Sequence, residues 1–124
     1  MIIDDLATYA QTNSIGTIGS TLFEGHMPAT PDNCVCIYET GGLELDRDIP
    51  VEEPTFQVLI RNKTYAGARA KAASVVTAFQ AVRNQTLTAT YFYYIFAQQS
   101  PYSLGRDENE RAEITVNFIC KIRR

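Results

Sequence analysis

A strand followed closely by a helix, within residues 54–82, is the feature that most constrains how this chain can fold. Phe56, Val58 and Ile60 alternate with mostly polar residues, which is the period of a β-strand with one buried face. Leu59 interrupts the polar set, so we expect the second face to be half covered. The pattern predicts a strand that leads directly into the helix.

The residues after this strand change to a helical period. Thr64 is a candidate N-cap, and apolar residues then recur at steps of three or four, which predicts one apolar stripe. Several of these residues are alanines, which favour a helix and allow it to lie close to a sheet. The stripe consists of Tyr65, Ala68, Ala72, Val75, Val76, Phe79 and Val82. We therefore expect one long helix over about residues 64–83.

Weaker patterns place the other elements around this unit. An N-terminal helix is expected over 2–12, with Ile3, Leu6, Ala7 and Ala10 on one face. Strands are expected at 21–23, at 33–39, within 84–89, at 91–99 and at 112–122. The sequence predicts one α+β domain, residues 1–124. Its mixed, mostly antiparallel sheet is packed by the long helix and the N-terminal helix.

Two of the expected strands belong together. Residues 112–122 alternate strictly, and we expect them to pair with 91–99 as an antiparallel hairpin. The segment 91–99 is aromatic on both faces, which favours a central strand covered on each side. Base stacking is the other interpretation of its tyrosines, but no basic residues are interleaved with them. Residues 101–111 are expected to form the turn between the two strands.

Composition excludes several classes of protein. The net charge of -3 argues against a nucleic-acid binder that neutralises phosphates. Three cysteines in 124 residues indicate reduced thiols and a cytoplasmic setting. The first residues lack the basic and apolar regions of a signal peptide, and the longest apolar run, Tyr91 to Ala97, is too short to span a bilayer. We expect a protein that is soluble or assembled inside a cell.

No motif in the chain predicts catalysis or a cofactor. Cys34, Cys36, Cys120 and His26 are the only conceivable metal set, but their spacing lacks the paired ligands of zinc sites. A cysteine hydrolase would need a thiol near His26, and core thiols are the simpler interpretation. The pair Gly16 and Gly19 is interpreted as a turn. We expect no enzyme activity, no metal, no cofactor and no small-molecule substrate.

Charged residues gather in two segments. The loop from Gly41 to Pro54 carries Glu44, Asp46, Asp48, Glu52 and Glu53 against one arginine, Arg47. Its length allows either a solvated connection or a contact role. The second segment places Asp107, Glu108, Glu110 and Glu113 beside Arg106 and Arg111. We interpret it as a salt-bridged hairpin tip, which would set register if it met another copy of the chain.

Four stretches in this order and spacing carry a family resemblance. They are FEGHMPATPD at 23–32, IYETGG at 37–42, PTFQVLIRNKTYAGARAKA at 54–72 and SPYSLGRDENERAEITVNF at 100–118. Together they cover most of the chain, and the chain resembles the tail-terminator family of long-tailed bacteriophages, also called tail completion or minor capsid proteins. Family members have a sheet packed by helices, which is similar to the fold expected here.

The resemblance implies a structural role without catalysis. Such proteins form a hexameric ring that caps the tail tube, stops its polymerisation and presents a surface to the head-side connector protein during head–tail joining. The implied partners are further copies of the chain, the tail tube protein and the connector; DNA passes through without specific binding. The implied location is the tail or neck of the virion, assembled in the cytoplasm of the bacterial host. No membrane is involved.

The resemblance also assigns roles to particular residues. Arg61, Gly105, Arg106, Asp107, Glu108, Arg111 and Asn117 fall in the matching stretches, where turn geometry and subunit contact are the implied roles.

A closed ring needs two different complementary patches on each chain. The acidic loop with Glu44, Asp46 and Asp48 and a basic helix face with Arg69, Lys71 and Arg83 are the candidate partners.

Two other functions stay open at this stage. A head-side connector or adaptor protein of the phage neck would assemble in the same manner but bind other neighbours. A cytoplasmic cysteine-dependent enzyme would lose its activity on thiol alkylation.

Overall fold

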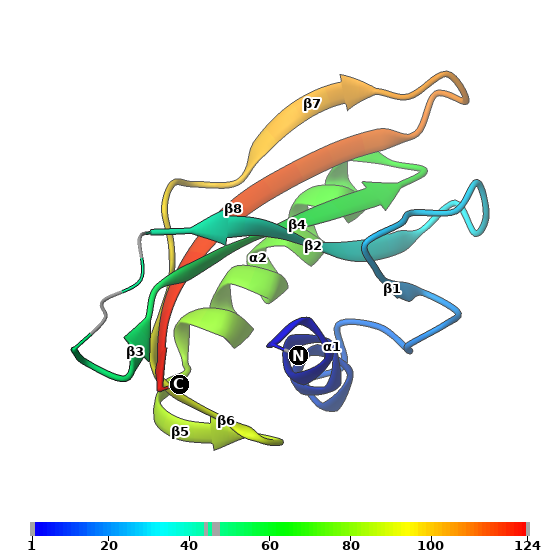
Figure 1. Cartoon of the computed structure of the whole chain (residues 1–124). Helices are drawn as coiled ribbons and strands as arrows, with labels where there is room; N and C mark the ends of the chain where they lie inside the picture. Colours follow the sequence, from blue (N-terminus) through cyan, green and yellow to red (C-terminus); the bar gives the residue numbers. More distant parts are fainter. Residues whose placement is uncertain (1, 44, 46–47, 124) are drawn as a thin grey trace.

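The computed structural model describes residues 2–43, 45 and 48–123. In this part of the chain a curved sheet carries two helices on one face (Figure 1). The elements are α1 (Ile2–Thr12), β1 (Leu22–Glu24), β2 (Cys34–Gly42), β3 (Val51–Glu52), β4 (Pro54–Asn62), α2 (Tyr65–Gln80), β5 (Arg83–Leu87), β6 (Thr90–Ala97), β7 (Tyr102–Arg106) and β8 (Ala112–Arg123).

Strand β8 is the centre of the sheet. Strand β4 runs along one of its edges, and β6 and β7 share the other, β6 beside residues 118–122 and β7 beside residues 112–115. The strand order is β1-β2-β4-β8-β6-β5, with β3 and β7 paired to β8 alone. Every pair is antiparallel except β1 with β2. The α+β class and the mixed, mostly antiparallel sheet are therefore confirmed.

The core lies between the sheet and the two helices. Phe56 of β4, Phe118 of β8 and Phe79 of α2 pack together with ring centroids 5.0 to 5.3 Å apart. Each such burial contributes about 2–3 kcal/mol to stability. The hydroxyl of Tyr9 in α1 donates to the carbonyl oxygen of Ala78 in α2 at 2.6 Å, which ties the helices together. The predicted inner face of α1 is buried: Ile3, Leu6, Ala7 and Ala10.

Helix α2 begins as predicted but ends early. The Thr64 side chain accepts a hydrogen bond from the Gly67 N–H at 3.1 Å, which confirms the N-cap. The helix stops at Gln80 rather than near residue 83, because the Val82 carbonyl accepts from the N–H of Ile95 in β6 at 3.3 Å and the chain turns into the sheet. Val82 is nevertheless buried. Tyr65 is 49% exposed, so the apolar stripe of the helix begins one turn later than predicted.

The aromatic strand is covered on one face only. In β6, Phe92 and Ile95 are buried against the helices, while Phe96 points the other way and is 45% exposed. The prediction of a strand covered on both faces was wrong, since none of the described elements covers the outer face of the sheet at Phe96. Strands β6 and β8 are antiparallel as predicted, but they do not form a hairpin because β7 lies between them in the chain.

Two predicted connections contain strands. The expected turn over 101–111 includes β7, and the expected loop from Gly41 to Pro54 includes the end of β2 and the short β3. Both β3 and β7 obtain their backbone hydrogen bonds from β8 and bury little of their own surface, so alternation did not reveal them. The link after α2 contains β5, in agreement with the strand expected within 84–89. Among the described helices, none is both long and apolar enough to cross a membrane.

Candidate interface surfaces

A loop on the outer face of the sheet is held by a buried arginine. The connection from β1 to β2, residues 25–33, must return along the parallel pair that it joins. Arg61 of β4 donates from Nη2 to the carbonyl oxygens of Pro28 at 2.8 Å and Pro31 at 2.6 Å, and from Nε to that of Asp32 at 3.3 Å. Only 4% of Arg61 is exposed. One side chain thus fixes three carbonyls of the loop.

A second buried arginine connects the same loop to the β7–β8 turn. Arg111 donates from Nη1 to the carbonyl oxygen of Ala29 at 2.5 Å and contacts Asp32, while its Nε donates to Asp107 Oδ2 at 2.8 Å. The backbone N–H of Arg111 also donates to Asp107 Oδ1 at 2.9 Å. Hydrogen bonds from the Arg111 backbone and side chain lower the pKa of Asp107 below its ordinary value. The predicted salt-bridged tip is therefore present.

These contacts bring together stretches that lie far apart in the sequence. The loop at 25–33, the end of β4 and the turn at 107–111 meet at one corner of the molecule (Figure 1). The two arginines hold the 25–33 loop in one conformation, although the loop contains no helix or strand.

The thiols are poor candidates for chemistry. Cys34, Cys36 and Cys120 are free and buried. Burial raises the pKa of Cys34 and of Cys36, and it raises that of Cys120 to about 12, so the thiols stay protonated at neutral pH. Within the described ranges, no group of three His, Cys, Asp or Glu residues is placed to hold a metal ion.

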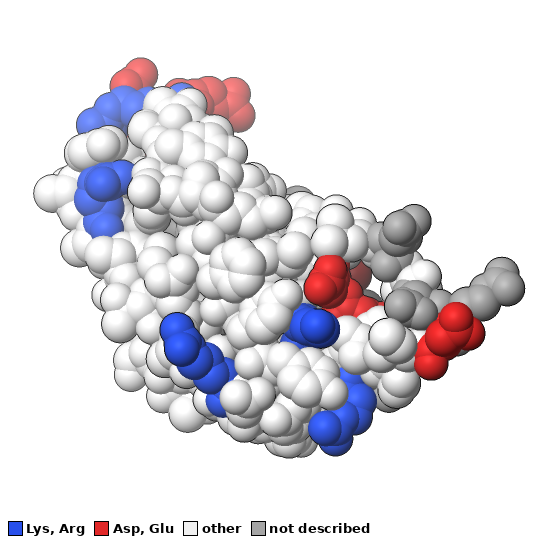
Figure 2. Space-filling model, turned by 90° about the vertical axis from the view of Figure 1, so that its left-hand side faces the viewer, with Lys and Arg blue, Asp and Glu red and all other residues white. Residues whose placement is uncertain are grey.

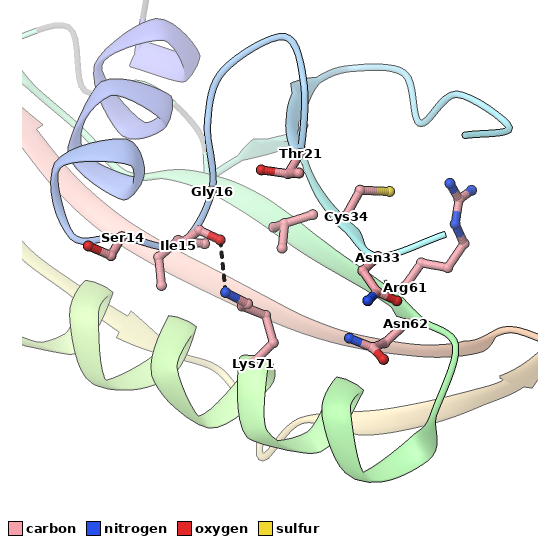
Figure 3. A pocket seen from close by; sticks show the side chains of 10 residues that line it. Ser14, Ile15, Gly16, Thr21, Asn33, Cys34, Arg61, Asn62 and Lys71 are labelled. Atoms are coloured by element: carbon pink, nitrogen blue, oxygen red, sulfur yellow. Dashed lines mark hydrogen bonds between the residues drawn. The ribbon is translucent and has the colours of Figure 1, made fainter. Parts of the chain in front are cut away.

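A polar pocket of about 400 Å³ opens where α2 faces the loop after α1 and the start of β2 (Figure 3). Lys71 of α2 donates from Nζ to the carbonyl oxygen of Ile15 at 3.1 Å. Asn33 and Asn62 lie opposite, with their amide nitrogens on the side that faces Lys71. We call this feature the donor pocket. Its polar side chains are Ser14, Thr21, Asn33, Arg61, Asn62 and Lys71.

An apolar surface lies on the opposite part of the sheet. Phe96, Tyr102 and Leu104 are 45%, 41% and 52% exposed, and all five residues of β7 are exposed. Among the described strands β7 pairs with β8 alone, so its second edge carries backbone groups outside the sheet. The side of the molecule shown in Figure 2 has a broad area without Lys, Arg, Asp or Glu between scattered charges. Exposed apolar groups of this kind mark contact surfaces.

The acidic segment, residues 43–53, joins β2 to β4 at the end of the pair where residues 42 and 54 lie opposite each other; the structure describes its residues 43, 45 and 48–53. Leu43, Leu45 and Ile49 are more than half exposed, and Asp48 is exposed beside them. The other two predicted interface residues of this segment, Glu44 and Asp46, lie outside the described residues. Exposed apolar and acidic side chains thus occur together at one end of the molecule.

The remaining predicted interface residues are spread over three places. Arg69 is exposed on α2 and donates to the carbonyl oxygen of Pro101 at 3.2 Å. Arg106 donates to the carbonyl oxygen of Glu110 at 2.6 Å, and Glu108 is exposed at the same turn. Arg83 belongs to β5 and not to the helix, so the predicted basic helix face retains Arg69 and Lys71 only.

Sequence reasoning missed the two asparagines of the donor pocket and the exposed apolar residues of β6 and β7. Asn33 directly precedes β2 and Asn62 is the last residue of β4, places where an asparagine is usually interpreted as a turn residue. Two asparagines at the same end of one antiparallel pair were the available signal, because β2 and β4 place residues 34 and 61 opposite each other.

The chain was also compared with known proteins. Residues 9–124 match the family described as bacteriophage tail terminator protein. The fold is similar to that of a chain in the solved virion of a native gene transfer agent particle, with a TM-score of 0.67 and 15% identity. That match covers 96% of this chain and 84% of the other, and at this identity it shows likeness of fold alone. A comparison with curated proteins found no match.

Proposed function

Because this chain belongs to the bacteriophage tail terminator family, we propose that it forms a ring on the end of the tail tube. There it stops tube polymerisation and offers the tail-side surface for joining to the head. The chain is a structural protein of this family, and the family match over residues 9–124 is the observation that carries the proposal. Its place is the tail–neck region of the virion, assembled in the cytoplasm of the host.

The surface of the molecule supports assembly. A closed ring requires two different patches on each subunit, one complementary to the other. The acidic segment lies at one end of the β2–β4 pair, and the arginine-held loop and the donor pocket lie toward its other end. We further propose that the ring has six copies and that DNA passes through it without specific binding. The net charge of -3 favours passage of DNA over its retention, because like charges repel.

A third surface is available for the tube or the connector. Phe96, Tyr102 and Leu104 expose apolar area next to the second edge of β7. A partner strand added to that edge would gain backbone hydrogen bonds as well as apolar contact. We assign this surface to the tail tube. In the proposed ring each subunit would present one such β7 edge, so the ring would offer the tube one edge per copy.

The test is the mass of the purified protein by light scattering, alone and with isolated tail tubes. A species near 83 kDa, about six times the 13.9 kDa chain, or protein recruited only to tube ends, is the expected result. Recruitment should also prevent further growth when tube subunits are added. A protein that stays monomeric and ignores tubes, but binds the head-side connector region, would replace this function with that of a neck adaptor.

A further inference from the structure

The donor pocket is built from hydrogen-bond donors. The Asn33 Oδ1 atom accepts from the backbone N–H of Lys63 at 2.9 Å, and Asn62 Oδ1 accepts from that of Thr64 at 3.1 Å. Since each amide oxygen is occupied, each NH₂ group is turned into the pocket, as Figure 3 shows. Lys71 uses one N–H on the Ile15 carbonyl and retains two more donors.

The orientation of Asn62 is fixed by its neighbours. A Cβ atom at Gly67 would lie 2.5 Å from Asn62 Oδ1, so the amide packs directly against the glycine in the first turn of α2. The Thr64 hydroxyl also approaches the same oxygen at 3.4 Å. The amide is therefore held in place before any ligand arrives, which lowers the entropic cost of binding.

The chemistry of the pocket specifies an anion. No Asp or Glu is among the ten described residues that line it, and Lys71 contributes positive charge; the guanidinium of Arg61 is bonded to the 25–33 loop and points away from the pocket. A carboxylate offers acceptor oxygens only and can take hydrogen bonds from both amides and the ammonium together. The volume of about 400 Å³ admits a side chain with its flanking backbone.

The position of the pocket identifies the source of the carboxylate. Residues 34 and 61 face each other at the pocket end of the β2–β4 pair, and residues 42 and 54 do so at the end that bears the acidic segment. Nine residues of strand separate the two ends by about 30 Å. A subunit thus carries acceptors at one end and donors at the other, which is the arrangement that a head-to-tail contact requires.

We propose that the donor pocket binds a carboxylate of the acidic segment from a neighbouring copy of this chain, with Asp48 as its main ligand. The inference rests on the proposed ring, because only the ring brings a neighbour to the pocket. A DNA phosphate is the less favoured occupant, because one lysine with no basic side chain from the 14–21 loop gives little of the positive field that DNA binding needs.

A charge-swap series tests the contact. Lys71→Glu and the loop variant Asp46→Lys/Asp48→Lys should each raise the protein concentration needed for ring assembly by about tenfold or more. The variant that combines both changes should assemble within about threefold of the natural chain, because the charges are then exchanged. Assembly of Lys71→Glu at the natural concentration, or failure of the combined variant to recover, would overturn the proposal.

The matched control is Lys63→Glu. Its side chain makes the same change of charge next to the pocket, but it is exposed and does not line the cavity. We expect an effect below about threefold, which separates a specific contact from a general change of charge. Circular dichroism and thermal melting of every variant confirm that the fold is retained, and Lys71→Met repeats the test without adding a charge.

A second measurement separates this inference from the ring itself. A cyclised peptide of residues 42–54 is titrated into the monomer while the side-chain amide signals of Asn33 and Asn62 are followed by NMR. Shifts with this peptide, and none with a version whose carboxylates are amides, support the pocket even if no ring forms in solution. Absence of shifts, or shifts produced instead by a short DNA duplex, would exclude the acidic segment as occupant whatever the oligomeric state.

Discussion

The charged side chain of Arg61 makes its hydrogen bonds within the subunit. Alternation places it on the outer face of β4, and it does point outward, but three carbonyls of the 25–33 loop close over it. The sequence could identify the residue as part of a matching stretch, yet the loop that buries it lies about thirty residues earlier. No periodic pattern relates the two, so its burial could not be predicted. The same reasoning applies to Arg111.

Replacing Arg61 by methionine should lower the free energy of unfolding by about 3 kcal/mol, since three buried carbonyls lose a charged donor. Lysine at this position should restore only part of the loss, because it lacks the fork of donors. Urea unfolding monitored by circular dichroism measures both. Arg69→Met, which removes one exposed hydrogen bond, is the control and should change stability by less than about 0.5 kcal/mol.

The contribution of Asp107 should depend on pH. Its pKa in the folded chain lies below the ordinary value of 3.8, so the carboxylate stabilises the fold above about pH 4. This stabilisation is lost as the pH falls through the folded pKa. Asp107→Asn should therefore melt at a lower temperature than the natural chain at pH 7, and the difference should be smaller at an acidic pH at which the carboxylate becomes protonated. Equal differences at both pH values would contradict the assigned hydrogen bonds.

At the scale of elements, strong periodicity predicted most of the structure. The even-numbered residues of β8 and the inner face of α1 are buried as expected, and Thr64 caps α2. Strand β7 was missed because Pro101 directly precedes it, Gly105 lies within it, and none of its residues is buried. The strand forms because its backbone hydrogen-bonds to the edge of β8. A strand defined by its partner leaves no alternation of its own to detect.

The first turn of α2 offers a test of how one element depends on another. Alanine usually favours a helix over glycine by up to about 1 kcal/mol, but at position 67 its Cβ would collide with the Asn62 amide. Gly67→Ala should thus destabilise the natural chain by about 1 kcal/mol and stabilise an Asn62→Ala background by about 0.5 kcal/mol. A double-mutant cycle by chemical unfolding measures this coupling. Equal effects in both backgrounds would show that the amide moves aside freely.

At the scale of the whole molecule, the folded core and the surfaces proposed for assembly are separate. The core lies on the helix side of the sheet, whereas exposed large apolar residues lie on β6, on β7 and in the acidic segment, and also at Ile18 and Tyr65. The length and charge of the acidic segment allowed either a solvated connection or a contact role, and the contact role stays a prediction. The sequence could not predict the β7 surface, because aromatic residues on both faces of a strand are also typical of a buried one.

Leu104→Asp should separate assembly from stability. The side chain is 52% exposed, so the free energy of unfolding of the monomer should change by less than about 0.5 kcal/mol. Binding to tube ends should weaken by at least about tenfold, because a charge replaces apolar contact area. Quantitative end-labelling by electron microscopy measures the binding. Leu104→Met keeps the apolar surface and should bind as the natural chain does; equal binding of all three would remove β7 from the tube contact.

The central position of β8 also has a consequence for synthesis. Of the eight described strands it is the last to leave the ribosome, yet β3 and β7 pair with it alone, and β4 and β6 each pair with it along one edge. We expect the nascent chain to remain without its native sheet until translation has passed residue 112. A chain that stalls earlier would be left with an unpaired β4 edge. Interrupted synthesis would thus yield material for proteolysis rather than a defective subunit that could enter the particle.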